Sequence, residues 1–331
     1  KLLLKTPPQH WSNNMEEIYN WGLSIITGIQ QIKSPIITLL MEGISFFFFL
    51  VFYFFLLMII YWCVDAKKGF QLGTIIIFSG AFNTAIKQTL KVPRPYQRNS
   101  AVFIVEETGF STPSGHSQGS ASFYPIVANF FCKGKSLAKI IIQLLVAIFV
   151  PLLIGFSRIY LGVHYPTDVF LGLIIGFLTA TGVLLFWDFF AERIASLRLS
   201  IKFLLLALLC LLLNHFSQGN ISLSGLLFGF VGGHLFFIEK KSFDAKTGLL
   251  WQKILRILLG SFIVTFFFFF PKFIISFLGM DSPENQWYDL IRFLRYMLTG
   301  AATSFLVPTM FLKLKLADKF PTENNLKEIN Q

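Results

Sequence analysis

The chain has 331 residues, of which 54% are hydrophobic and only 14% are charged, and its formal net charge is +11. A soluble protein carries about a quarter charged residues, so the composition excludes a soluble globular protein and indicates a membrane protein. The positive charge does not indicate a nucleic-acid-binding protein, because no soluble domain or basic helix is available to dock a duplex and membrane topology accounts for the lysines.

The predicted elements begin with an amphipathic helix and continue with apolar helices. Residues 15–32 alternate apolar side chains with Glu, Asn and Gln, a pattern too polar to span a bilayer and typical of a helix in the membrane interface. The apolar segments that follow approach or exceed the roughly 20 residues that a span requires. We therefore predict an all-α polytopic bundle. About nine transmembrane helices are expected, at residues 38–63, 70–90, 115–132, 138–157, 166–187, 201–216, 221–238, 252–271 and 293–312.

Lysine and arginine predict the orientation of this bundle. More than half of the 28 basic residues fall on one side of the predicted membrane. That side is reached by residues 64–69, 133–139, 188–202, 239–253 and the C-terminal segment. Since cytoplasmic loops are enriched in Lys and Arg, we expect this side to be cytoplasmic and the N-terminus to lie outside.

Three short motifs combine basic residues with two histidines and a carboxylate. They are Lys87-x6-Arg94-Pro95, Pro113-Ser114-Gly115-His116 and Ser157-Arg158-x5-His164-x3-Asp168. Each motif falls at the end of a predicted helix, and all the helix ends involved lie on the predicted non-cytoplasmic face. We therefore expect the three motifs to form one site at the outer membrane surface.

The residue types predict a site for phosphoryl chemistry. Lys87, Arg94 and Arg158 supply the fixed positive charge that stabilises the oxygens of a transferring phosphoryl group. Ser114 and Gly115 open a predicted helix, where backbone N–H groups bind anions. These five residues are the predicted phosphate ligands.

The two histidines and the aspartate are the predicted catalytic residues. Asp168 lies one helical turn after His164 and is expected to hydrogen-bond one ring nitrogen, which leaves the other nitrogen to attack phosphorus. His116 is expected to protonate the leaving group and later to activate water. No cluster of carboxylates, His or Cys indicates a metal, and we expect no cofactor. Cys63, Cys132 and Cys210 are interpreted as small core residues.

The three motifs resemble the signature of the type-2 phosphatidic acid phosphatase superfamily, which is related to vanadium haloperoxidases and glucose-6-phosphatase. All three match without substitution and in order. The resemblance covers roughly residues 60–190. It implies a phosphatase/haloperoxidase-like helical core, a phosphohistidine intermediate at His164, and the same roles for the other motif residues.

These observations predict four regions and a function. The regions are an interfacial segment (1–34), a catalytic bundle (35–190), four additional transmembrane helices (191–316) and a polar cytoplasmic tail (317–331). The expected function is metal-independent hydrolysis of a phosphomonoester or diphosphate headgroup by a phosphatase of a bacterial inner or plasma membrane, with the site facing the periplasm or exterior. Phosphatidic acid, phosphatidylglycerol phosphate and polyprenyl diphosphate all fit as substrates.

Three other functions remain open on the sequence. They are a sugar-phosphate phosphatase of the glucose-6-phosphatase type, a lipid phosphotransferase, and a lipid transporter or binding protein. The sequence leaves the oligomeric state and the role of the last four helices open. Outside the motifs, Asn83 is expected to hydrogen-bond a neighbouring helix, and His215 and His234 are interpreted as core or interface histidines.

Overall fold

The computed structural model describes residues 13–47, 50–134, 136–240 and 243–319. The chain divides into two compact units. The first unit comprises residues 1–53 and 79–189, and the second comprises residues 54–78 and 190–331. Within the described residues there is no named strand, only an isolated bridge between Phe243 and Lys319. The prediction of an all-α bundle is confirmed.

Every predicted span coincides with helix in the structure, although not every one of these helices is long and apolar. Among the described residues, six helices are long and apolar enough to cross a membrane. They are Ala66–Arg98, Leu137–Tyr160, Pro166–Ala195, Leu199–Ser217, Leu250–Phe277 and Tyr288–Lys313. Shorter apolar helices lie at Pro35–Phe46, Tyr53–Val64 and Ser222–Ile238. The number of nine transmembrane helices stays a prediction, as do the four predicted regions.

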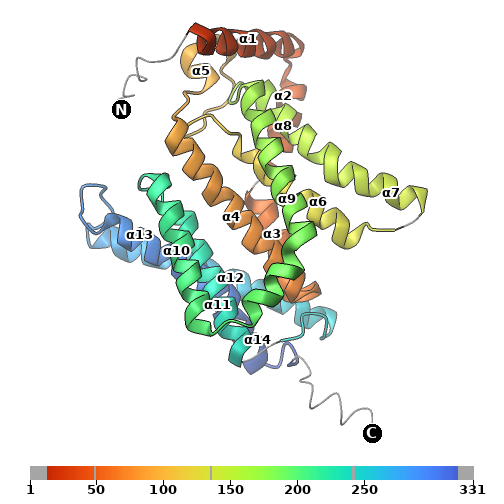
Figure 1. Ribbon diagram of the computed structural model, residues 1–331, viewed down its shortest axis with the longest axis vertical. Helices are drawn as coiled ribbons and strands as arrows, with labels where there is room; N and C mark the ends of the chain where they lie inside the picture. The colour runs from red at the N-terminus through yellow and green to blue at the C-terminus, as the bar shows by residue number, and fades with distance from the viewer. Residues whose placement is uncertain (1–12, 48–49, 135, 241–242, 320–331) are drawn as a thin grey trace. The chain divides into compact units, whose positions relative to one another are not determined.

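The first unit contains the helices that carry the three motifs (Figure 1). Its elements are α1 (Asn13–Ile29), η1 (Gln30–Ile32), α2 (Pro35–Phe47), the end of α4 (Ala66–Leu90), α5 (Pro95–Arg98), η3 (Ser100–Val102), α6 (Gly115–Phe131), α7 (Leu137–Leu144), η4 (Leu145–Phe149), α8 (Val150–Tyr160) and most of α9 (Pro166–Ala195). Helices α7 and α8 are continuous through η4, a π-helical segment.

Helix α6 is the buried centre of the first unit. It is less apolar than the helices named above, because Ser and Gln replace apolar residues along it. These polar side chains are buried. Hydrogen bonds to neighbouring helices or within α6 satisfy them, as buried polar groups require. Ser122 hydrogen-bonds Ser79 of α4 at 2.9 Å, and Gln118 accepts from Asn83 of α4 at 2.8 Å. The predicted interhelical hydrogen bond of Asn83 is confirmed.

Glycines on α9 allow it to approach α6 closely. A Cβ atom at Gly172 would lie 2.6 Å from the carbonyl oxygen of Ser114, and one at Gly176 would lie 2.5 Å from that of Gln118. Both distances are shorter than any real Cβ contact, so only glycine fits. The same close approach lets the Ser114 N–H donate to the Asp168 carbonyl oxygen at 3.0 Å. Two of the three motifs are therefore joined by their backbones.

Helix α1 crosses one end of the first unit, beside α5 and α8 (Figure 1). Ile18 and Trp21 are exposed, whereas Tyr19 and Ile26 are buried, which gives the amphipathic pattern expected of an interfacial helix. Arg98 of α5 forms two hydrogen bonds with the Glu16 carboxylate, at 2.9 and 3.0 Å. Hydrogen bonding to this guanidinium lowers the pKa of Glu16.

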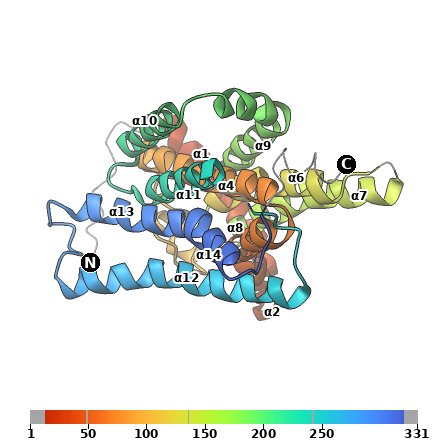
Figure 2. The ribbon, with the colours of Figure 1, turned by 90° about the horizontal axis from the view of Figure 1, so that it is seen from below.

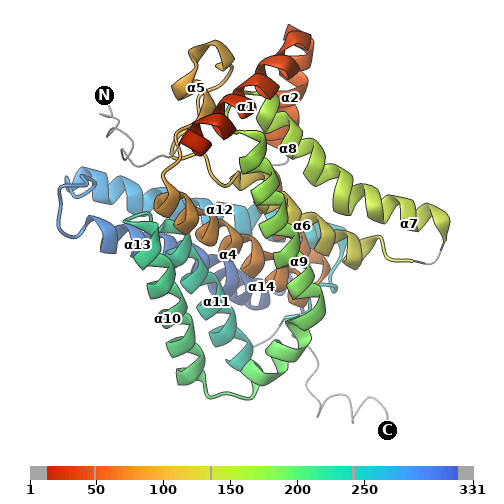
Figure 3. The ribbon, with the colours of Figure 1, turned by 45° about the horizontal axis from the view of Figure 1, so that its top comes forward.

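The second unit is built around the pairing of α11 with α13. Its elements are α3 (Leu50–Ile59) from residue 54 on, η2 (Ile60–Val64), the start of α4, the end of α9, α10 (Leu199–Ser217), α11 (Ser222–Lys240), α12 (Leu250–Phe277), α13 (Tyr288–Ala301), η5 (Ala302–Leu306) and α14 (Val307–Lys313). Figure 2 shows α12 running alongside α13, and Figure 3 shows α10 beside α11. A Cβ atom at Gly229 would lie 1.9 Å from the Met297 carbonyl oxygen, so α11 and α13 touch through their backbones.

Two polar side chains in this unit serve packing. His234 stacks on Phe70, with ring centroids 3.7 Å apart, and its Nδ1 lies 2.9 Å from the Tyr61 hydroxyl. These contacts agree with its interpretation as a core or interface histidine. Arg256 is fully buried and donates to the carbonyl oxygens of four residues: Trp62, Ala245, Thr247 and Leu316.

Candidate active site

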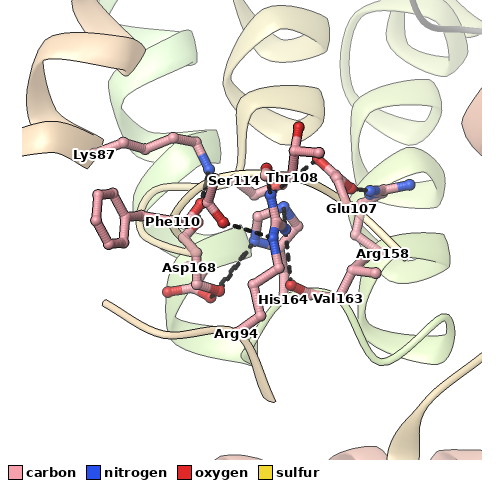
Figure 4. A network of polar contacts seen from close by, with 12 residues as sticks. Lys87, Arg94, Glu107, Thr108, Phe110, Ser114, Arg158, Val163, His164 and Asp168 are labelled. Carbon is pink, nitrogen blue, oxygen red and sulfur yellow. Dashed lines mark hydrogen bonds and ion pairs between the residues drawn. The ribbon is translucent and has the colours of Figure 1, made fainter. Parts of the chain in front are cut away.

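Four helix ends of the first unit bring the three motifs together (Figure 4). Lys87 lies in the last turn of α4, Ser114 caps the start of α6, Arg158 lies in the last turn of α8 and Asp168 in the first turn of α9. The loop from residue 99 to 114 runs among these ends and contributes carbonyl groups to the site. The structure thus places all the predicted site residues in one cluster.

The Asp168 carboxylate is held by three donors. Ser111 donates to Oδ2 at 2.5 Å, the Tyr165 N–H donates to the same oxygen at 2.8 Å, and Thr112 donates to Oδ1. The side chain is 1% exposed. A buried carboxylate with this many donors is fixed in both position and orientation.

His164 presents one ring nitrogen to Asp168 and the other to Arg94. Its Nδ1 lies 3.6 Å from Asp168 Oδ2, and 3.4 Å from the Ser111 hydroxyl. The direct hydrogen bond expected between His164 and Asp168 is therefore not formed, because 3.6 Å exceeds the length of a hydrogen bond. The Ser111 hydroxyl instead contacts both side chains. The other nitrogen, Nε2, lies 3.3 Å from Arg94 Nη1.

The surroundings of His164 favour its neutral form. Burial lowers the pKa of His164 well below its ordinary value. Nearby basic side chains lower the pKa further: Lys87, Arg94, Arg158 and His116. A neutral imidazole keeps the lone pair that a nucleophile needs.

The turn that places His164 between α8 and α9 depends on a glycine. Gly162 has φ +71°, and a Cβ atom at this position would meet the backbone of Val102.

Arg94 is anchored almost entirely by neutral groups. Its guanidinium donates to three backbone carbonyl oxygens, at 2.7 to 3.1 Å: those of Thr108, Gly109 and Val163. Its own backbone is fixed as the N-cap of α5, where its N–H donates to the Gln97 side chain at 2.9 Å and Pro95 begins the helix. The fork is therefore rigid and buried beside His164.

Lys87 is also directed by the loop from residue 99 to 114. Its Nζ donates to the carbonyl oxygens of Phe110 and Ser111, at 2.6 and 3.0 Å. An ammonium group has three N–H donors, and these two bonds use two of them.

Arg158 and Glu107 form an ion pair in the same cluster. Arg158 Nη2 pairs with Glu107 Oε2 and its Nη1 donates to Ser45, while its buried Nε has no hydrogen-bond partner among the described residues. The other Glu107 oxygen, Oε1, lies 3.3 Å from Arg94 Nη2. One carboxylate therefore bridges two of the three predicted phosphate-binding cations.

The Pro-Ser-Gly-His motif begins α6 as predicted. The Ser114 side chain caps the helix by accepting from Ser117, and the Ser114 N–H is already used by Asp168. Gly115 and His116 are the first two helical residues, whose N–H groups have no acceptor within the helix. A Cβ at Gly115 would lie 3.2 Å from Asn83 Oδ1.

Sequence reasoning missed three functional side chains, all in the loop from residue 99 to 114. Ser111 and Thr112 fix Asp168, and Glu107 bridges the two arginines. Glu107 had a usable signal, since a carboxylate between two cationic motifs needs a partner. Among the described residues, no group of three or more His, Cys, Asp or Glu is placed to hold a metal ion.

The helical architecture and the site define an integral membrane protein with a buried cationic cluster around a histidine. Residues 68–193 match the model of the PAP2 superfamily, and residues 221–319 match that of the PAP2 superfamily phosphatase, transmembrane extension. The chain belongs to the PAP2 superfamily.

Curated proteins match over part of the chain. The phosphatidylglycerophosphatase B of Bacillus subtilis is 36% identical over 99 residues, which cover 29% of this chain and 46% of that protein. The lipid phosphate phosphatase delta of Arabidopsis thaliana is 24% identical over 166 residues, covering 47% of this chain and 40% of that protein. The chain thus spans less than half the length of these curated relatives.

Among solved structures, a transmembrane PAP2-type phosphatidylglycerolphosphate phosphatase from Bacillus subtilis is similar, with 27% identity and a TM-score of 0.47. The match covers 56% of this chain and 90% of that one.

Proposed function

We propose that the chain is a membrane lipid phosphatase that hydrolyses a phosphomonoester or diphosphate headgroup through a phosphohistidine. The observation that carries this proposal is the position of His164. Its Nε2 lies against the Arg94 fork, while its Nδ1 faces the fixed Asp168. A nucleophile, an orienting carboxylate and a cationic phosphate cradle are thereby in contact.

In the first step, Nε2 of His164 attacks phosphorus and the bond to the leaving oxygen breaks. Lys87, Arg94 and Arg158 stabilise the charge that develops on the phosphoryl oxygens. His116 donates a proton to the leaving alkoxide or phosphate. Asp168 and Ser111 stabilise the ring of His164 from the Nδ1 side as it becomes positively charged.

In the second step, water attacks the phosphohistidine. His116 accepts a proton from this water, the phosphorus–nitrogen bond breaks, and neutral His164 and inorganic phosphate are regenerated. Ser114 and Gly115, with the first N–H groups of α6, complete the phosphate cradle.

A lipid substrate is favoured by the setting of the site. The motifs lie at helix ends of a membrane bundle, and the exposed apolar side chains of α1 indicate a membrane interface beside them. A headgroup at this level reaches the site while its acyl or isoprenoid chains stay in the bilayer. The names of the two curated relatives, a phosphatidylglycerophosphatase and a lipid phosphate phosphatase, agree with this substrate class.

The decisive experiment measures phosphate release from a panel of substrates by the full chain in detergent. The panel contains phosphatidic acid, phosphatidylglycerol phosphate, undecaprenyl diphosphate and glucose 6-phosphate. We expect release from at least one lipid, complete loss in His164→Ala, and no inhibition by EDTA. His215→Ala, which replaces an exposed histidine outside the site, is the matched control. Full activity of His164→Ala would exclude the phosphohistidine mechanism, and activity on glucose 6-phosphate alone would favour the sugar-phosphate alternative.

We propose further that the site faces the non-cytoplasmic side of a bacterial inner or plasma membrane. The distribution of Lys and Arg supports this orientation. In a cysteine-free background, Ser100→Cys should react with an impermeant maleimide added to intact cells. Ser196→Cys, an exposed position on the predicted cytoplasmic side, should be protected. The reverse pattern would invert the proposed topology.

A further inference from the structure

We propose that Glu107 is a resident anion that occupies the phosphate position between Arg94 and Arg158 and sets the selectivity of the site for dianionic phosphate. The proposal rests on the proposed function and deepens it, because it names which phosphate groups enter the site. Glu107 lies in the loop between the first two motifs and belongs to neither of them.

The two carboxylate oxygens of Glu107 are divided between the two arginines. Oε1 lies 3.3 Å from Arg94 Nη2, and Oε2 pairs with Arg158 Nη2 (Figure 4). In the proposed mechanism, two oxygens of one phosphoryl group contact the same two forks. The carboxylate and the phosphate therefore compete for one position.

Glu107 is the partner that can leave. Its side chain is 28% exposed, against 1% for Arg94 and 5% for Arg158. Its backbone is held in place by Tyr96, whose hydroxyl donates to the Glu107 carbonyl oxygen at 2.7 Å and accepts from its N–H at 3.3 Å. The side chain can rotate toward solvent while the loop stays in place.

Each arginine has a partner other than Glu107. Arg94 retains its three carbonyl acceptors, which belong to Thr108, Gly109 and Val163. Arg158 retains Ser45. Glu107 is therefore not the sole group that holds either guanidinium.

Arg158 also shows that the carboxylate does not satisfy the site. In the part of the chain that the structure describes, its buried Nε has no hydrogen-bond partner, although buried donors are nearly always paired. A phosphoryl group presents three terminal oxygens in a tetrahedral arrangement, so it offers an acceptor for Nε in addition to Nη2. The orphaned donor indicates that this fork is shaped for a ligand larger than the resident carboxylate.

Competition with a resident anion gives selectivity. The phosphodiester lipids that make up the surrounding membrane carry one negative charge on the phosphate group. A terminal phosphomonoester or a diphosphate carries a larger negative charge. A ligand must replace the attraction between Glu107 and the two arginines before it binds, so the more highly charged phosphate is favoured and the abundant phosphodiesters are excluded.

The test measures binding and turnover in parallel with the full chain in detergent. Binding of inorganic phosphate is measured by isothermal titration calorimetry for the wild type, Glu107→Gln and the control Glu106→Gln. Glu106 is the exposed neighbour in the same loop, so its substitution removes the same charge. We expect Glu107→Gln to tighten phosphate binding about threefold to tenfold and Glu106→Gln to leave it within twofold.

A second measurement addresses selectivity. Dioctanoyl phosphatidylglycerol, a phosphodiester, should inhibit phosphate release by Glu107→Gln at concentrations that leave the wild type unaffected. If Glu107→Gln does not yield a folded protein, Glu107→Asp replaces it, because the shorter carboxylate does not reach both arginines. Unchanged or weaker phosphate binding in the folded variant would overturn the proposal. Phosphate binding without turnover of any lipid by the wild type would refute the proposed function but not the role of Glu107.

Discussion

The two units each bury an arginine near the end of a helix, and the two arginines are satisfied in different ways. Arg256 in the second unit donates only to backbone carbonyl oxygens, which come from four residues in separate segments. Arg158 in the first unit has one hydroxyl, one carboxylate and an unpaired Nε. A guanidinium saturated by neutral backbone groups fixes the chain, whereas one with an open donor and a displaceable anion is available to a ligand.

The largest effect on activity is expected for substitution of Arg158. Arg158→Lys should lower kcat/KM for phosphate release by about 10³-fold, because a lysine cannot supply a planar fork to the phosphoryl oxygens. The Tm should change little, since only Ser45 and Glu107 lose a partner. Activity assays and thermal unfolding of the same preparation check both parts. A large decrease in Tm would show that Arg158 stabilises the fold, as Arg256 is expected to do.

The opposite result is expected for Arg256→Lys. A lysine cannot reach all the carbonyl oxygens, and each unsatisfied buried group costs stability, so the free energy of unfolding should fall by about 3 kcal/mol. The activity of the protein that remains folded should be close to that of the wild type. Denaturant titration followed by tryptophan fluorescence measures the free energy of unfolding. An assay of activity per folded molecule measures catalysis. A selective loss of activity would contradict the structural role.

A smaller effect tests the electrostatics around His164. Lys87→Met removes a positive charge that helps to hold the pKa of His164 below its ordinary value. The pKa of His164 should therefore rise, and the acid limb of the kcat/KM profile should move to higher pH, in addition to any loss of phosphate binding. Lys91→Met, at an exposed position one turn later, is the control. An acid limb that moves to lower pH would contradict the expected rise in the pKa of His164.

The smallest effect is expected at Arg98, a half-buried arginine paired with an exposed carboxylate. Arg98→Ala breaks the two hydrogen bonds to Glu16 and the stacking of Arg98 over Tyr19, where the guanidinium carbon lies 4.4 Å from the ring centroid. Solvent screens this pair, so the Tm should stay within about 2 °C of the wild type. Differential scanning fluorimetry checks this. A larger shift would mean that α1 docking contributes more than exposed charge pairs usually do.

The helices and the motif residues could be predicted from sequence because each depends on local pattern. Hydropathy located helices at the predicted spans, and the expected alternation of helix direction placed Lys87, Arg158 and Asp168 in one cluster. The predicted helix starts at residues 115 and 166 agree with the structure. These features require no knowledge of tertiary contacts.

The remaining features depend on how loops fold, and sequence pattern does not specify that. Glu107 reaches the arginines only because Tyr96 fixes the loop, and Ser111 reaches Asp168 only because the same loop passes the start of α9. The carbonyl ligands of Arg256 come from segments far apart in the chain. Sequence pattern located α6, at the predicted span 115–132, but not the burial of its Ser and Gln side chains among other helices.

The backbone hydrogen bond between Ser114 and Asp168 has a practical consequence for handling the protein. It exists only while α6 and α9 are packed against each other at Gly172 and Gly176. A detergent that loosens this packing separates the two motifs although each helix keeps its own hydrogen bonds. Circular dichroism would then report a helical protein while catalysis had ceased, so specific activity is the more sensitive measure of whether a solubilised preparation is native.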